Sequence, residues 1–292
     1  MTYEIVHRTS YKYSDLVTAS RHTARLMPRS AGEQVCESTS IFIEPAPASR
    51  RDFCDYFGNA ICSVAIQEPH REFSVTARSR VRFEPSTILR DCAPSPAWEE
   101  VAASFRDPVP PELVEPYQFV FDSPMLNASP VLANYARESF PNGMSLIVGA
   151  SHLTRRIFED FEYDPVATSI ATPLEEVIEK RRGVCQDFAH FAIAALRSLG
   201  LSARYVSGYL RTHPAPGRER LVGGDASHAW FSAHCPATGW IDFDPTNNLR
   251  PSHEHITVAV GRDFSDVSPV SGVITGGGEH EVTVSVDVAE VQ

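Results

Sequence analysis

Cys185, His228 and Asp244 are the residues whose types and order along the chain could together perform covalent chemistry. A cysteine is a nucleophile once its thiol has lost a proton, and a histidine can accept that proton. A carboxylate beside the histidine orients the ring and stabilises its charged form. A cysteine, a histidine and an acid in this relation form a triad that can attack an amide carbonyl.

The position of Cys185 depends on the helix that is predicted to follow it. The apolar residues Phe188, Ala192, Ala195 and Leu199 recur at helical spacing and form one stripe. Gly200 stands where a left-handed helix end is expected. Cys185 therefore falls in the first turn, where free N–H groups and the helix dipole favour a thiolate. The alternative is that Cys185 is a small buried residue without chemistry.

His228 and Asp244 come together if the chain between them forms a β-hairpin. Residues 227–234 and 239–244 are predicted to be strands, and residues 235–238 have the composition of a turn. In an antiparallel pair, His228 near the start of the first strand lies close to the end of the second. Asp242 and Asp244 both share the parity of His228, and the register favours Asp244 as the partner.

Three further features of the sequence could bind the substrate, the oxyanion or a metal. The oxyanion formed at the carbonyl is expected to bind the N–H of Cys185, with the Gln186 side chain as a second candidate donor. Trp230 could line a substrate groove, although packing in the core is the more frequent role of tryptophan. His253-Glu254-His255 resembles a fragment of a metal site, but no further ligands follow at a recognisable spacing, so no metal is expected.

The whole chain of 292 residues is predicted to be an α+β protein. Alternating strands and turns in residues 1–90 indicate a β-sandwich-like domain. Residues 91–128 read as a proline-rich connecting segment, and residues 129–292 as a catalytic core that ends in a strand. In that last strand Val282, Val284, Val286 and Val288 share one face.

Composition excludes several classes of function. The net charge is −11 and no basic run exists, which argues against a nucleic-acid partner. No stretch of about 18 apolar residues is present, which argues against a membrane span. The chain starts without an apolar signal segment, and its six cysteines include no C-x-x-C pair. We therefore expect reduced thiols and a cytoplasmic location.

Several motifs taken together resemble the bacterial transglutaminase-like superfamily. They are Gly183-Val184-Cys185-Gln186-Asp187-Phe188-Ala189, His228-Ala229-Trp230, residues 203–210, residues 239–246 and residues 258–267. The resemblance implies a papain-like core packed on an antiparallel sheet, preceded by a β-domain. It also implies that Cys185 is the nucleophile, His228 the base and Asp244 the residue that orients the base.

Members of this superfamily include transglutaminases, peptidases and amidases, so the resemblance leaves the acceptor open. We expect hydrolysis of a peptide, protein or small-amide substrate without a cofactor. Our reason is that the loop from Arg211 to Ser227 and the N-terminal domain could cover the two sides of the cleft. The alternatives are an amine-transferring transglutaminase, an inactive interaction module on the same fold, and, less favoured, a metal-binding protein.

Overall fold

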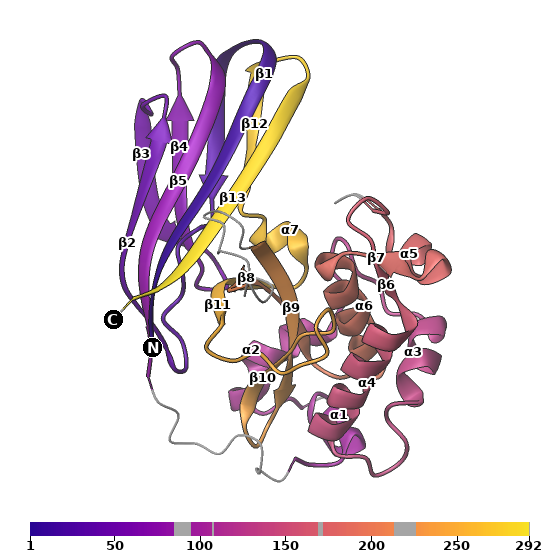
Figure 1. Ribbon diagram of the computed structural model, residues 1–292. Helices are drawn as coiled ribbons and strands as arrows, with labels where there is room; N and C mark the ends of the chain where they lie inside the picture. Colours follow the sequence, from indigo (N-terminus) through magenta and orange to yellow (C-terminus); the bar gives the residue numbers. More distant parts are fainter. Residues whose placement is uncertain (85–94, 107, 169–171, 213–225, 292) are drawn as a thin grey trace, which may run out of the picture.

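The N-terminal part of the protein is a seven-stranded antiparallel sheet around one long strand, β1 (Thr2–Ala24). The computed structural model describes residues 1–84, 95–106, 108–168, 172–212 and 226–291 (Figure 1). The other strands of this sheet are β2 (Gln34–Glu44), β3 (Ser49–Cys54), β4 (Ala60–Ile66), β5 (His70–Phe83), β12 (Val270–Gly276) and β13 (His280–Val291).

Strand β1 is long enough to pair with two sets of neighbouring strands. Its first half pairs with β5 on one side and β13 on the other, and its second half pairs with β4 and β12. Strand β2 pairs with β5 and strand β3 with β4, which completes the sheet. Alternate residues at the start of β1 are buried, as expected for a strand with one face on the core.

The last strand pairs with β1 of the N-terminal sheet, although the sequence grouped it with residues 129–292. Thr2 pairs with Val291 and Tyr13 with His280, so β13 lies along β1 and the two chain ends are adjacent (Figure 1). The alternation of valines predicts a half-buried strand, but it contains no information about a partner almost the whole chain away. The predicted boundaries near residues 90 and 128 stay predictions.

A second, four-stranded sheet has the order β10-β9-β8-β11. Its strands are β8 (Ala203–Leu210), β9 (Ala226–Cys235), β10 (Gly239–Phe243) and β11 (His255–Gly261). Strands β9 and β10 form the predicted hairpin, with Cys235 opposite Gly239 and Phe231 opposite Phe243. The positive φ of Gly239, 78°, suits the tight connection between them.

Helix α6 (Cys185–Arg197) is the central helix and contacts both β8 and β9. The other short elements are α1 (Trp98–Ser104), η1 (Pro111–Leu113), α2 (Val114–Tyr117), η2 (Gln118–Val120), α3 (Pro130–Arg137), α4 (Leu146–Asp160), β6 (Glu162–Tyr163), α5 (Leu174–Lys180), β7 (Arg182–Gly183) and α7 (Phe264–Val267). None of the helices in the part of the chain that the structure describes has the length and apolarity needed to cross a membrane.

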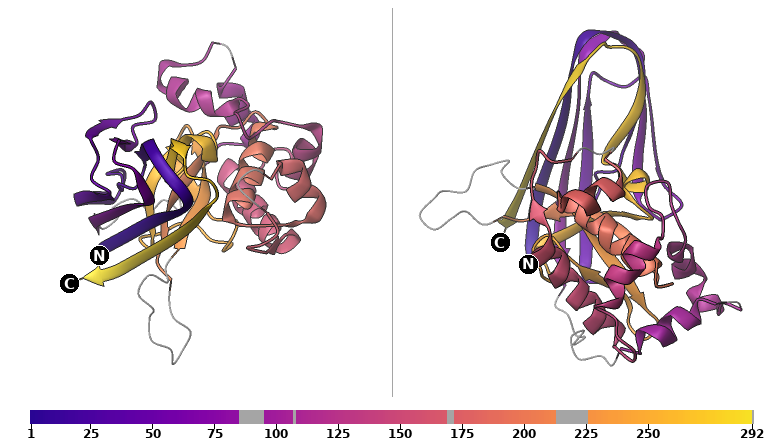
Figure 2. Two further views of the ribbon diagram at one scale, coloured as in Figure 1. Left: turned by 90° about the horizontal axis from the view of Figure 1, so that it is seen from above. Right: turned by 90° about the vertical axis from the view of Figure 1, so that its right-hand side faces the viewer.

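The elements are arranged in three layers, in which the four-stranded sheet lies between the N-terminal sheet and most of the helices (Figure 2). One buried cluster includes Tyr3 and Ile5 of β1, Val286 and Val288 of β13, and the apolar face of α6. The predicted α+β class, with an N-terminal β-domain and a cysteine-bearing helix on an antiparallel sheet, is confirmed.

Candidate active site

Cys185 is the first residue of α6, as predicted, and it is half-buried. The preceding residue, Val184, is extended, and its N–H donates to the Asp187 carboxylate at 2.8 Å. The Thr168 hydroxyl donates to the same carboxylate at 2.6 Å. A Cβ on Gly183 would lie 2.6 Å from Oδ2 of Asp187, so glycine is required for this approach. These contacts fix the turn that presents the thiol.

His228 lies between Cys185 and Asp244. Its Nε2 is 2.7 Å from Oδ2 of Asp244, and the ring also hydrogen-bonds to the Cys185 side chain. His228 and Asp244 are 7% and 0% exposed. Burial opposes a charge on the ring, but the bonds to Asp244 and Cys185 outweigh it and raise the pKa of His228 to about 10. The ring therefore holds its proton at neutral pH.

The carboxylate of Asp244 is held by the turn that follows it. Its Oδ1 accepts from the backbone N–H groups of Thr246 and Asn247 at 2.9 and 3.2 Å. The Asn247 amide donates to Oδ2 at 2.7 Å, and backbone bonds between Asp244 and Leu249 close the turn. Burial opposes the charge, but the bonds from His228, His255 and Asn247 hold the pKa of Asp244 well below its usual range.

Asp242, the other acid considered from the sequence, points to a different partner. It lies opposite Ser232 in the β9–β10 register, and the Ser232 hydroxyl donates to its carboxylate. The expected preference for Asp244 over Asp242 as the neighbour of His228 therefore agrees with the geometry.

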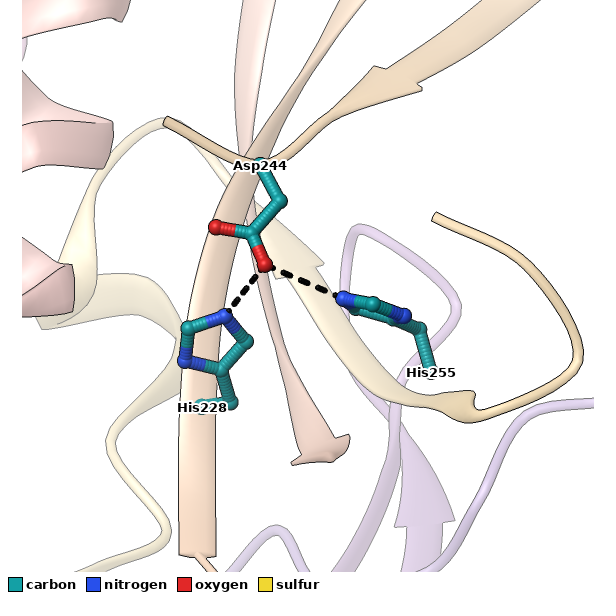
Figure 3. A group of neighbouring side chains, drawn as sticks. All are labelled: His228, Asp244 and His255. Carbon is teal, nitrogen blue, oxygen red and sulfur yellow. Dashed lines mark hydrogen bonds and ion pairs between the residues drawn. The ribbon is translucent and has the colours of Figure 1, made fainter. Parts of the chain in front are cut away.

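Asp244 has a second histidine neighbour, which the sequence did not indicate. His255, at the start of β11, places its Nε2 3.1 Å from Oδ2 of Asp244, on the side away from His228 (Figure 3). His255 is buried, and the Trp230 ring lies edge-on at 5.2 Å between centroids. The His253-Glu254-His255 stretch had suggested a metal fragment, and its third residue instead touches the Asp244 carboxylate.

The ligand atoms of His228, Asp244 and His255 lie within 4.8 Å of one another, close enough to share a metal ion. A metal on both Nε2 atoms would displace the protons that now bond to Asp244. We interpret the group as a hydrogen-bond network, because the carboxylate already accepts from both rings. The expectation that the protein has no metal stays a prediction.

Trp230 lies in the core, whereas Gln186 lies at a pocket. Trp230 is 0% exposed and packs with Val206 and Val260, so it cannot line an open groove as the sequence analysis considered. Gly208 makes room for it, since a Cβ there would lie 2.5 Å from the Trp230 ring. Gln186 is half-buried and does border a pocket, whose lining does not include Cys185.

That pocket has a volume of about 530 Å³ and lies between the two parts of the molecule. One wall is a face of β1 and β13, and the opposite wall includes Gln186, Ser227 and Phe264. Gln186 and Ser227 are the chain neighbours of Cys185 and His228. The N-terminal sheet therefore borders the site. Most of the Arg211–Ser227 loop, expected to cover the other side, lies outside the residues that the structure describes.

Two family patterns match the chain. Residues 3–82 match the bacterial transglutaminase-like N-terminal region, and residues 134–245 match the transglutaminase-like superfamily. The second match includes Cys185, His228 and Asp244.

Relatives and a solved structure extend the likeness over the whole chain. An uncharacterized protein of Mycobacterium tuberculosis is 38% identical over 98% of this chain and 92% of its own length. An uncharacterized protein of Mycobacterium leprae is 32% identical over 98% of both chains. The structure described as "a Putative Cysteine Protease from Cytophaga hutchinsonii" covers 100% of this chain and 91% of its own, at 22% identity and a TM-score of 0.74. That structure shares the fold.

Proposed function

The chain belongs to the transglutaminase-like superfamily, and from that premise we propose that it is a cysteine-dependent enzyme that cleaves an amide bond through a thioester. One observation carries the proposal: a series of contacts from the buried side chains of Asp244 and His228 to the half-buried Cys185. Each member has the neighbour that its chemical role needs.

In the first half of the proposed reaction, the Cys185 thiolate attacks the carbonyl carbon and the carbonyl oxygen becomes an oxyanion. The Cys185 N–H is available to it, because the first N–H groups of a helix have no partner within the helix. The C–N bond then breaks, the amine leaves with the proton from His228, and the acyl group stays on sulfur as a thioester.

In the second half, His228 takes a proton from water as the water attacks the thioester. The C–S bond breaks, the carboxylic acid leaves, and the thiolate–imidazolium pair returns. Asp244 stabilises the charged ring at both stages. A primary amine in place of water would give transfer of the acyl group.

We favour hydrolysis of a peptide, protein or small amide over amine transfer. The N-terminal sheet borders a pocket with Gln186 and Ser227, the chain neighbours of Cys185 and His228. A site narrowed on that side suits one extended substrate better than two protein chains that meet at the thioester.

The test supplies a library of peptides and small amides with an excess of a primary amine, and follows acid and amide products by mass spectrometry. Cys185→Ala is the control and should give neither product. Acid as the main product supports hydrolysis, and a dominant amide product at modest amine concentration would show that transfer is the natural reaction.

The reactivity of the Cys185 thiol distinguishes the proposed enzyme from an inactive interaction module on the same fold. We expect iodoacetamide at neutral pH to label Cys185 faster than Cys54, which is exposed and has no histidine partner among the described residues. Cys62 is buried, and burial raises its pKa to about 11, so it should react slowly. Cys185 labelled no faster than Cys54 would support the module.

We also propose a cytoplasmic location. The five cysteines that the structure describes, Cys36, Cys54, Cys62, Cys185 and Cys235, are free thiols. A reducing compartment keeps thiols in this state. Cell fractionation with an antibody against the protein tests the proposal, and recovery from an extracytoplasmic fraction would contradict it.

A further inference from the structure

Strand β13 carries apolar side chains that the fold leaves uncovered. Val282 and Val284 are 46% and 52% exposed, whereas Val286 on the same face is buried. Exposed valines in a row on one strand face are usually explained by a binding partner.

Strand β1 extends this face across the sheet. Val282, Val284 and Val286 pair with Tyr11, Thr9 and His7, and directly paired residues of an antiparallel ladder point to the same side. These six residues form one wall of the pocket that Gln186 and Ser227 also line. We call this wall the valine wall.

The opposite wall is adjacent to the catalytic groups. Gln186 follows Cys185 in the first turn of α6, and Ser227 precedes His228 on β9. Phe264 and Val270 add apolar surface. A group that occupied this pocket would therefore contact the chain neighbours of Cys185 and His228, although neither of these two residues lines it.

The lining also indicates which chemistry the pocket accepts. It contains no Asp, Glu, Lys or Arg among the residues that the structure describes. Its two most buried polar side chains, His7 and Thr9, bond to each other at 2.8 Å. A charged side chain placed here would lose water and find no opposite charge, whereas an apolar one would cover Val282 and Val284.

We propose that the pocket between the valine wall and α6 binds a large aliphatic or aromatic side chain of the substrate, next to the cleaved amide. This inference rests on the proposed function. A volume of about 530 Å³ is in the range of pockets for small ligands and accommodates a side chain rather than a folded domain. The N-terminal sheet thus selects the substrate in addition to narrowing the site.

The test compares Val284→Glu with the matched control Val273→Glu. Val273 is 70% exposed, lies in the same sheet on β12 and does not line the pocket. The substrates are peptides that differ only in leucine, glycine or aspartate beside the cleaved amide. We expect Val284→Glu to lower kcat/KM for the leucine peptide about 10-fold, mainly through KM, as loss of a buried apolar contact predicts. The control should stay within about 2-fold of the wild type, since surface changes usually have small effects.

A binding measurement separates failure of this inference from failure of the proposed reaction. Fluorescent forms of the same peptides are titrated into Cys185→Ala protein, with and without Val284→Glu, and followed by anisotropy. Leucine-selective binding that Val284→Glu removes supports the pocket even if the wild type cleaves no amide. Equal binding of leucine and aspartate peptides, or equal effects of the two glutamates, would overturn it.

A second copy of the chain is the other candidate to cover the valines. Sedimentation of the wild type and Val284→Glu decides this point. A wild-type dimer that becomes a monomer in Val284→Glu would assign the valine wall to self-association and overturn the inference, whereas a monomer in both supports it.

Discussion

At the scale of single residues, Asp244 is the centre of the site. Its two oxygens accept from His228, His255, the Asn247 amide and two backbone N–H groups. A carboxylate with this many donors is ionised and fixed in orientation. It can therefore hold His228 in the one tautomer that leaves the other ring nitrogen for the thiol.

We predict that Asp244→Asn lowers kcat by on the order of 10⁴, the loss known for the equivalent change in a serine-protease triad. Asp242→Asn is the matched control, because it carries the same change on the same stretch of chain but contacts Ser232. Steady-state kinetics of the two purified variants provides the comparison. Equal losses, or a larger loss for Asp242→Asn, would contradict the assignment.

The pH profile is a second test at this scale. Because Asp244 and Cys185 raise the pKa of His228 to about 10, the charged ring persists well above neutrality. We expect the alkaline limb of kcat/KM to lie toward pH 10, where His228 loses its proton. An alkaline limb near pH 6.5, the ordinary value for histidine, would show that the ion pair does not form.

His255 is expected to act as a positioning residue, since its hydrogen bond goes to Asp244 and its ring packs near that of His228, with 5.9 Å between the two centroids. A hydrogen bond to a charged group contributes about 1.5–3 kcal/mol, so His255→Asn should lower kcat by about 10-fold or more. KM should change little, and the alkaline limb should move to lower pH. If the alkaline limb of the His255→Asn pH profile is unchanged and the variant has a lower melting temperature, the role of His255 is purely structural. His253 lies two residues earlier and is exposed, so His253→Asn is the control variant.

These residues also show how far the sequence predicts the site. Parity and hairpin register bring His228 to Asp244 because both lie on neighbouring strands joined by a short turn. His255 could not be found this way, because it reaches Asp244 from β11, which is separated from β10 in the sheet by β9 and β8. The β8–β11 pairing also contains an irregularity at Thr257, which no pattern in the sequence indicates.

At the scale of elements, the start of α6 determines where the thiol lies. Gly183 and Asp187 approach so closely that a methyl group on Gly183 would meet the carboxylate at 2.6 Å. Asp187 is an acid in the first turn of α6, a position that suits the helix dipole. Its bonds to Val184 and Thr168 show that it also anchors the preceding turn.

We predict that Gly183→Ala destabilises the protein by about 1–3 kcal/mol, the usual cost of overpacking, and lowers kcat because Cys185 moves. Asp187→Ala removes the obstructing carboxylate, so the double variant should be more stable than the sum of the single effects implies. Denaturant unfolding of the four proteins of this cycle measures the coupling. Strict additivity would show that the two residues do not meet.

At the scale of the whole molecule, the two sheets share one core. Tyr3 and Val286 of the N-terminal sheet belong to the same buried cluster as Phe188 of α6. The sequence could predict each domain from its own pattern. The joint core depends on the return of β13 to β1, a contact between opposite ends of the chain that local patterns do not encode.

The fold buries four histidines and keeps them neutral. Burial lowers the pKa of His7, His22, His190 and His234 to about 4 each. In the unfolded chain the same rings take up protons near pH 6.5, so the unfolded state binds more protons between pH 6.5 and 4. Stability is therefore present above pH 6.5 and falls as the pH drops toward 4. His228 does not offset this loss, because its raised pKa makes its contribution complete below pH 6.5.

We accordingly expect the melting temperature to fall by several degrees between pH 7 and pH 5, with calorimetry as the measurement. His22 stacks on Phe73 with ring centroids 3.9 Å apart, and its Nε2 has no hydrogen-bond partner among the described residues. His22→Phe keeps the ring stack and removes the proton site, so its melting temperature should depend less on pH than that of the wild type. Exposed His253, changed to glutamine, should leave the slope unaltered. If His22→Phe and the wild type show the same slope, the acid sensitivity comes from other groups, and the inference that burial of His22 keeps its ring neutral is wrong.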